Sequence, residues 1–197
     1  MARQQYKTLL LIATIVLALF AASPAIQKLV VAPPNQELTE LSILGPYHNA
    51  TYPYYLLSGA DFTVYLNVTN HMDSCAYYNL QVKFRNETQS APDSFNFTSS
   101  TQPALSNSTF ILSNEQSTEL PISFSFNYDI TGTTQLNMQS IVINGYSLDS
   151  SGTTIAYNPD KKGFFGNLFF ELWMFNDSTN AFQYNQRYVS LWLNMTA

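Results

Sequence analysis

The sequence predicts an all-β fold, an antiparallel immunoglobulin-like β-sandwich preceded by one N-terminal apolar helix. The composition supports this, since 15% of the 197 residues are aromatic and only 11% are charged. About eight short stretches with alternating apolar residues recur, with turn signals at intervals of about 8 to 12 residues. No long stretch with charged faces and a helical period follows the N-terminal segment. A jelly roll is the alternative arrangement.

An uncharged apolar segment lies near the N-terminus. It follows Arg3 and Lys7 and extends to Lys28, and its most apolar part is residues 9–22. A run of about 14 residues fits a signal peptide, whereas about 20 residues can cross a bilayer. Residues 1–31 are therefore predicted to be a signal peptide, cleaved after Ala25, or a single membrane anchor. Because the basic residues come first, both interpretations keep the N-terminus in the cytoplasm and send the rest outside.

Residues 32–37 contain two consecutive prolines and are predicted to be a linker, followed by an extracytoplasmic β-sandwich domain at 38–197. Alternating apolar residues predict the strands of this domain, and the turn signal Gly45-Pro46 ends the first. The predicted strands are 38–44, 62–69, 78–85, 109–112, 120–128, 136–143, 167–175 and 187–195. A long polar loop is expected at 89–108 and a hairpin with a loose loop at 145–163.

Seven Asn-x-Ser/Thr sequons, about twice the number that random order gives, predict a glycoprotein. N-linked glycans are added outside the cytoplasm, which agrees with the export that the apolar segment predicts. The strand pattern places Asn67 and Asn194 on the more polar faces of their strands. The predicted glycosylation sites are Asn49, Asn67, Asn86, Asn96, Asn107, Asn176 and Asn194.

Metal-binding residue types are few. Cys75 is the single cysteine, so no disulfide can form within the chain, and we expect it to be a buried or partly buried small residue. His48 and His71 are the two histidines, and the spacing of His71, Met72 and Cys75 invites a blue-copper interpretation. Such a site would need a histidine after the cysteine, so no metal is expected. Instead, Asn70 and His71 should lie at a strand end and hydrogen-bond a turn.

Sequence motifs for catalysis or cofactor binding are missing. The chain contains no Gly-x-Ser-x-Gly, no His-Glu-x-x-His and no phosphate-binding glycine loop, so we expect no enzyme and no cofactor. Beyond Lys28, five basic residues stand against thirteen acidic ones, which argues against nucleic acid as a partner.

The two ends of the predicted domain resemble a known family. Residues 38–46, Tyr52-Pro53 and residues 64–71 are similar to the opening, and residues 167–173 and 188–193 to the close, of archaeal surface proteins classed as a domain of unknown function. The resemblance covers about residues 38–196. It implies a membrane-anchored, immunoglobulin-like β-sandwich ectodomain with no assigned activity and no catalytic residues. Many members carry several membrane spans, whereas this chain has at most one predicted span.

These observations predict a non-catalytic, N-glycosylated protein on the extracellular side of the cell membrane. It would act through contacts with the surface layer, a membrane complex or its own copies. One alternative is a filament subunit in which residues 26–32, freed by cleavage, complete the sheet of a neighbour. Another is a carbohydrate-binding module that uses the exposed aromatic residues Tyr52, Tyr54 and Tyr55.

Overall fold

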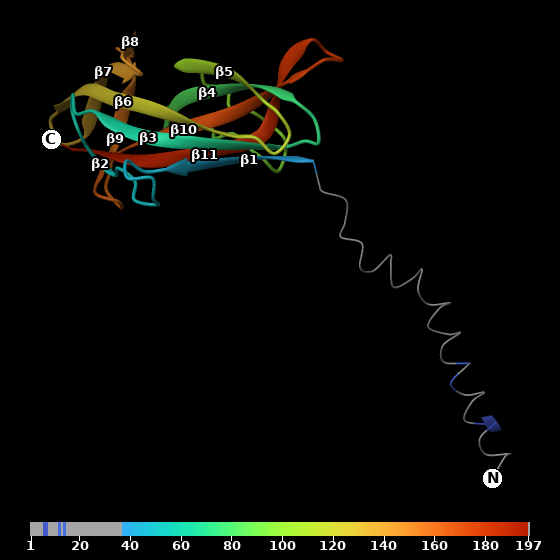
Figure 1. Ribbon diagram of the computed structural model, residues 1–197. Coiled ribbons are helices and arrows are strands. Elements are labelled where there is room, and N and C mark those ends of the chain that lie inside the picture. The colour runs from blue at the N-terminus through green and yellow to red at the C-terminus, as the bar shows by residue number, and fades with distance from the viewer. Residues whose placement is uncertain (1–5, 8–11, 13, 15–36, 197) are drawn as a thin grey trace. The chain divides into compact units, whose positions relative to one another are not determined.

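The computed structural model describes residues 6–7, 12, 14 and 37–196 (Figure 1). The chain divides into two units, Met1–Gln36 and Glu37–Ala197. In the first unit Tyr6, Lys7, Ile12 and Thr14 are helical, and the rest of the predicted apolar helix lies outside the described residues, as does the linker up to residue 36. In the described part of the chain no helix has the length and apolar character needed to cross a membrane.

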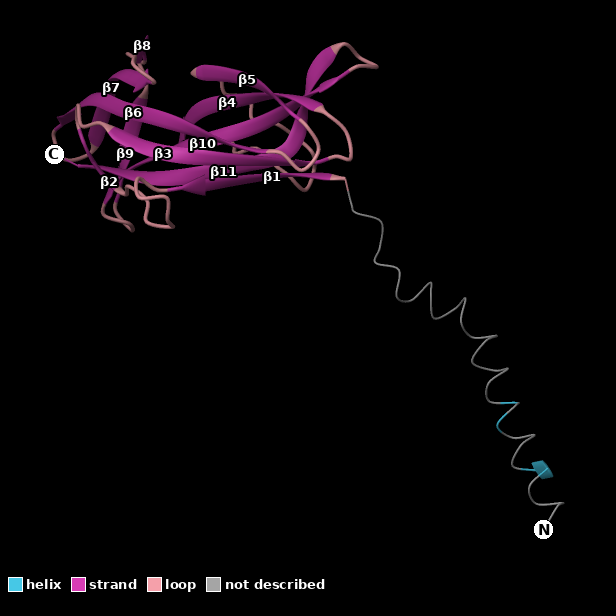
Figure 2. Ribbon diagram, viewed as in Figure 1, coloured by secondary structure: helices cyan, strands magenta, loops and turns pink. Residues whose placement is uncertain are grey.

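The second unit is built from strands, and none of residues 37–196 is helical (Figure 2). This confirms the predicted all-β class. Alternating apolar residues produce this structure because successive side chains of a strand point to opposite faces of the sheet. The strands are β1 Leu38–Leu44, β2 Tyr55–Leu57, β3 Phe62–His71, β4 Ala76–Asn86, β5 Ser106–Leu112, β6 Ser117–Thr131, β7 Gln135–Ile143, β8 Tyr146–Asp149, β9 Thr154–Asn158, β10 Gly163–Asn176 and β11 Ala181–Thr196.

The strands form two layers that are joined at one corner. One layer has the order β1-β3-β6-β7, with β8 on the far side of β7. The other has the order β5-β4-β10-β11-β2. Strand β9 pairs with β7 in the first layer and with β10 in the second, so the described strands form one curled sheet.

One strand pair departs from the predicted antiparallel arrangement. Strand β2 runs parallel to β11, with Tyr55 opposite Asn194, and every other pairing is antiparallel. The chain leaves β1 in one layer, crosses to the other and meets the edge of β11 in the parallel direction. The sheet is therefore mixed, which the strand pattern did not predict.

The hydrophobic core lies between the two layers. Inward-facing residues of both layers belong to one buried cluster, and across it the rings of Phe84 in β4 and Phe126 in β6 have centroids 5.2 Å apart. A buried hydrogen bond of 2.9 Å joins Thr39 Oγ1 in β1 to the Tyr78 hydroxyl in β4. The predicted β-sandwich is confirmed by this packing.

The predicted hairpin at 145–163 is wrong. Strand β8 pairs with β7, whereas β9 pairs with β7 and β10, and no pairing joins β8 to β9. The composition of this segment indicates turns. It does not indicate which strand elsewhere in the sequence each short strand pairs with.

Candidate functional site

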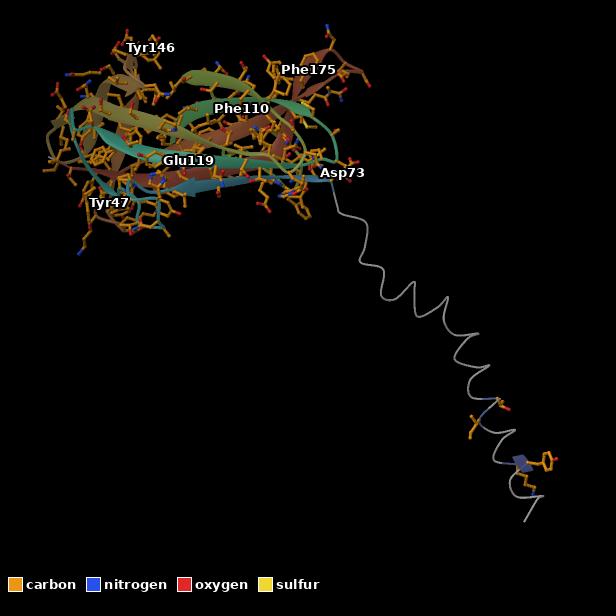
Figure 3. All side chains as sticks on the ribbon, viewed as in Figure 1. Tyr47, Asp73, Phe110, Glu119, Tyr146 and Phe175 are labelled. Atoms are coloured by element: carbon orange, nitrogen blue, oxygen red, sulfur yellow. The ribbon has the colours of Figure 1, made fainter. Side chains whose placement is uncertain are left out.

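The connection between β1 and β2 concentrates exposed aromatic side chains, and we call residues 47–57 the aromatic segment. Tyr47 is 81% exposed and Tyr55 is 68% exposed, and Tyr54 and Leu57 are also open to solvent. The Tyr47 side chain extends outward from the domain in Figure 3. Tyr54 and Tyr55 meet edge to face with ring centroids 4.8 Å apart, whereas Tyr52 donates a hydrogen bond to the Ile43 carbonyl. Of the three predicted binding tyrosines, two therefore form a solvent-facing pair.

A tight turn after β1 holds the start of this segment. The Gly45 amide donates to the Asn49 carbonyl at 2.7 Å, and the His48 amide donates to the Gly45 carbonyl at 3.0 Å. A Cβ atom on Gly45 would lie 1.7 Å from the Thr51 carbonyl oxygen, so only glycine fits there. The His48 ring stacks on Tyr65 at a centroid distance of 4.0 Å. The turn is thus fixed to the face of β3.

The end of the aromatic segment is fixed by β2. Leu56 is buried in the core, and its carbonyl accepts a hydrogen bond of 2.7 Å from the Tyr128 hydroxyl. The Asn194 amide donates to the Tyr54 carbonyl at 2.7 Å. Because Leu56 points inward, its neighbours Tyr55 and Leu57 point outward. The exposed aromatic pair therefore lies at a sheet edge that is hydrogen-bonded to β11 and to Tyr128.

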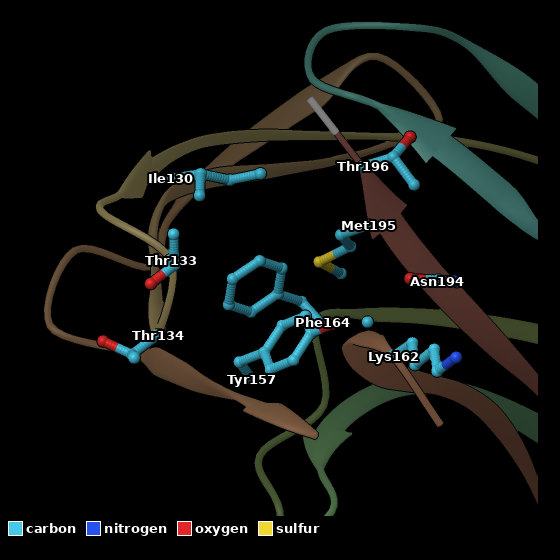
Figure 4. Close-up of a pocket in the computed structure, with 10 residues that line it drawn as sticks. Ile130, Thr133, Thr134, Tyr157, Lys162, Phe164, Asn194, Met195 and Thr196 are labelled. Atoms are coloured by element: carbon cyan, nitrogen blue, oxygen red, sulfur yellow. The ribbon is translucent and has the colours of Figure 1, made fainter. Parts of the chain in front are cut away.

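A pocket of about 570 Å³ opens next to this edge (Figure 4). Apolar groups of Ile130, Tyr157, Phe164 and Met195 line it, and Thr133, Thr134, Lys162, Gly163, Asn194 and Thr196 complete the wall. Asn194 is only 7% exposed, and its buried Oδ1 has no hydrogen-bond partner. A Cβ on Gly163 would come within 2.3 Å of that oxygen, so the amide packs directly over the glycine.

A buried ion pair lies on the outer face of the second layer. Lys83 Nζ of β4 donates to Glu171 Oε2 of β10 at 2.7 Å, and the two residues are 4% and 0% exposed. The Ser100 amide donates to Glu171 Oε1 at 2.6 Å, and Lys83 also donates to the Ser100 carbonyl at 3.2 Å. Ser100 belongs to the loop predicted at 89–108, so this loop packs against the sheet and covers the Lys83–Glu171 pair. The sequence did not predict this ion pair.

A tryptophan with two cations lies farther along the same face. The Arg85 guanidinium is 4.8 Å and Lys161 Nζ is 5.4 Å from the Trp192 ring centroid. Lys161 also forms an ion pair of 2.6 Å with Glu87. Burial lowers the pKa of Arg85 from its usual value, but an arginine remains charged at neutral pH. Both cations near Trp192 are therefore engaged in contacts within the domain.

Most predicted glycosylation sites lie at the surface. Asn49, Asn96 and Asn107 are exposed, and Asn67, Asn86 and Asn176 are partly exposed. Asn194 is the exception, because it is buried between β2 and β10 despite its place on the outer face of β11. Its sequon gave no sign that neighbouring strands would cover it.

The predicted turn at the end of β3 is confirmed. Asn70 Nδ2 donates to the Ser74 carbonyl at 2.8 Å, and Asn70 Oδ1 accepts from the Met72 amide at 3.1 Å. His71 Nδ1 lies 2.9 Å from Glu115 Oε2, and the hydrogen bond to Glu115 raises the pKa of His71. Within the described residues no group of three or more His, Cys, Asp and Glu side chains could hold a metal ion.

The expected burial of Cys75 is wrong, since its side chain is exposed. Free cysteines are usually buried because the thiol is apolar. Here Cys75 follows a turn in which Asp73 adopts a positive φ of 52°, and this turn carries it out of the sheet.

Comparisons with known proteins find no matching protein family and no matching curated protein. Among solved structures, a mutant β-glucosidase from Listeria innocua in complex with laminaribiose is 10% identical with a TM-score of 0.41, over 82% of this chain and 16% of that chain. The CARDB domain of a Pyrococcus furiosus protein in complex with di-metal ions is 9% identical with a TM-score of 0.37, over 85% and 97%. These values are too low to assign a family, an activity or a ligand.

Proposed function

We propose that this chain is a non-catalytic, N-glycosylated β-sandwich protein of the cell surface, held by its N-terminal segment and acting through protein contacts. The aromatic segment is the observation that carries the proposal. Tyrosine is enriched in the centres of protein interfaces, because it combines a large apolar ring with a hydroxyl and has few rotatable bonds. Tyr54 and Tyr55 meet edge to face, Leu57 is exposed on the β2 strand that pairs with β11, and Tyr47 is exposed in the same segment. Such a surface has the composition of a protein-binding site.

The order of the strands supports an immunoglobulin-like form of the sandwich. In that fold strands A, B and E neighbour one another in one sheet, and C, F and G in the other. Strands β1, β3 and β6 have the first arrangement and β4, β10 and β11 the second. The strand beside β6 is β7, which follows it in the sequence, whereas strand D precedes strand E in the immunoglobulin fold. This difference makes the domain a variant of the form.

Photo-cross-linking of the full chain in its native membranes tests the proposal. A photoreactive phenylalanine analogue would replace Tyr55, and a matched control would replace Tyr146, which is 78% exposed on β8. We expect the analogue at position 55 to give a discrete cross-linked protein band and the control to give none. Identical patterns at the two positions, or no protein adduct at position 55, would refute contact through the aromatic segment.

Mass spectrometry of the same preparation tests location. A chain that starts near Met1 and carries hexose mass at several sequons supports an anchored glycoprotein. A chain that starts at Ile26 in high-mass assemblies would favour the filament subunit instead. An unmodified chain would remove the basis for both.

Carbohydrate binding is a second candidate, favoured by the edge-to-face pair Tyr54–Tyr55 beside the pocket that contains Asn194. Aromatic rings bind the apolar faces of sugars, and amide groups bind their hydroxyls. Binding to a glycan array that is lost in Tyr54→Ala would support this candidate. The absence of binding by the wild-type chain would exclude it for the sugars tested.

A further inference from the structure

Strand β5 forms an edge of the second layer. It pairs with β4 through seven register positions, from Ala76 opposite Leu112 to Val82 opposite Ser106. No strand of the described residues pairs with its other side. Ile111 on β5 is 62% exposed, and Asn107 and Thr109 beside it are also exposed. The Leu112 carbonyl at the end of β5 accepts a hydrogen bond of 2.9 Å from Asn70 Nδ2, whereas the rest of the strand has no partner strand on this side and presents an exposed apolar side chain.

The other edges of the described sheet are protected, and β5 is not. Natural proteins protect edges with charges, proline, short strands or covering segments. Strand β8 has four residues and ends in Asp149, and β2 has three residues. Strand β1 contains Glu40, and the Arg187 side chain donates a hydrogen bond to its Thr39 carbonyl. Strand β5 has seven residues with neither charge nor proline. An unprotected edge of this length invites strand addition.

We propose that β5 pairs antiparallel with β5 of a second copy of this chain, around a two-fold axis at Thr109. This rests on the proposed function and names a second copy as the partner of those chains that carry no glycan on Asn107. The pairing is self-complementary, since Thr109 faces its own counterpart and Asn107 of one copy lies opposite Ile111 of the other. Because the seven residues are uncharged, no like charges oppose one another across the axis. The second layers of the two copies thereby form one continuous sheet.

A glycan at the Asn107 sequon would regulate pairing at this edge. The Asn107 side chain is exposed and makes no hydrogen bond within the described residues, so its Nδ2 is accessible to modification. An added strand lies about 4.8 Å away, within the space that a glycan on Asn107 would occupy. Copies glycosylated at Asn107 therefore stay apart at β5, and copies without this glycan pair.

Disulfide trapping of the full chain tests the pairing. The variant Cys75→Ser with Thr109→Cys removes the exposed native thiol and places a new one on the axis. In an antiparallel pair, opposed Cβ atoms are about 4.5 to 5.5 Å apart, close enough for a disulfide after a small adjustment. The control is Cys75→Ser with Ser147→Cys, on the exposed edge β8. In a host that adds no N-glycans, we expect a covalent dimer from the Thr109 variant and monomer from the control.

Two additional changes separate pairing from random collision. Adding Ile111→Lys to the trapping variant charges the edge and should reduce the dimer to the control level, whereas Ser147→Lys should leave it unchanged. Thr109→Cys breaks the Asn107 sequon, so the effect of the glycan is tested on chains that keep Thr109.

The measurement on the glycan therefore uses no engineered cysteine. The molar mass of the full chain in detergent, measured by sedimentation, compares the wild type from a glycosylating host with Asn107→Gln from the same host. We expect a monomer for the wild type, because both copies carry the Asn107 glycan, and a dimer for Asn107→Gln. A second comparison, Asn96→Gln, removes an exposed sequon away from β5 and should remain monomeric.

Three results would overturn the inference. They are equal trapping of the Thr109 variant and the Ser147 control, a dimer that survives Ile111→Lys, and equal molar masses of the wild type and Asn107→Gln. Cross-links from position 55 that persist in such a case would show that the proposed contact function stands while the β5 partner is wrong. If the cross-links from position 55 are absent while the β5 dimer forms, the β5 partner stands and contact through the aromatic segment is wrong.

Discussion

The predicted loop 89–108 ends at residue 105 in the structure, because β5 begins at Ser106, and we call it the loop 89–105. Replacing Lys83 by Met removes one partner of the buried ion pair under this loop. Lys83 and Glu171 are 4% and 0% exposed, and their Nζ and Oε2 atoms are 2.7 Å apart. In Lys83→Met the Glu171 carboxylate keeps the hydrogen bond from the Ser100 amide and the 3.2 Å contact from Trp173 Nε1, but it loses its cation. Breaking a buried pair in this way costs about 3 to 5 kcal/mol, because the remaining charge stays in a medium of low polarity.

A double-mutant cycle isolates the interaction from the lost packing. Glu171→Gln keeps an amide oxygen for the Ser100 amide, so Lys83→Met with Glu171→Gln removes both charges without leaving that donor unpaired. We expect the double variant to be more stable than Lys83→Met, with a coupling energy of at least about 2 kcal/mol. The control Lys161→Met breaks an ion pair with Glu87 whose side chains are 55% and 26% exposed, and it should cost less than about 1 kcal/mol.

Urea unfolding of the full chain, followed by tryptophan fluorescence, measures these values, since Trp173 contacts Glu171. Limited proteolysis should cut the loop 89–105 of Lys83→Met faster than that of the wild type. A cost below about 1 kcal/mol for Lys83→Met, or strictly additive effects in the cycle, would refute the reasoning.

Three other outcomes can be measured directly. Glycopeptide mass spectrometry should find hexose on Asn96, which is exposed, and none on Asn194, which is 7% exposed; a fully occupied Asn194 would contradict the packing. The bond to Glu115 raises the pKa of His71, so its contribution to stability is complete below the unfolded pKa of about 6.5 and is lost as the pH rises through the higher folded pKa. Thermal melts of His71→Gln should therefore fall below wild type at pH 5 and coincide with it at pH 9, and a constant difference would argue against this. Gly163→Ala places a Cβ within 2.3 Å of the Asn194 oxygen and should cost about 1 to 3 kcal/mol in urea unfolding, with recovery when Asn194→Ala is added.

The period of two in the sequence was enough to predict most strands. Leu38–Leu44 alternates and ends at Gly45-Pro46, and β1 has these bounds. Residues 167–175 and 187–195 lie inside β10 and β11, which extend farther because the hairpin between them continues pairing to Asn176 and Ala181. Alternation is a local property, so it identifies a strand without identifying its neighbour.

The features that depend on distant neighbours were missed. Strand β2 has three residues, too few for a periodic signal, and its parallel partner begins more than a hundred residues later. Lys83 and Glu171 are 88 residues apart, and their pairing follows from the register of β4 with β10. The aromatic segment was recognised by composition, but its exposure depends on the turn at Gly45 and on the inward side chain of Leu56.

Strand β10 is buried on both faces, with ten consecutive buried residues from its start. One face packs in the core, and the loop 89–105 helps to cover the other through Ser100. Its first half, Phe164 to Phe170, has four phenylalanines and no charge, which is the composition of segments that assemble into cross-β fibrils when exposed. Pairing with β4 and β11 occupies the backbone of this segment, and the closed loop helps to keep its outer apolar face away from other chains. A variant that frees the loop should lose solubility before it loses its fold.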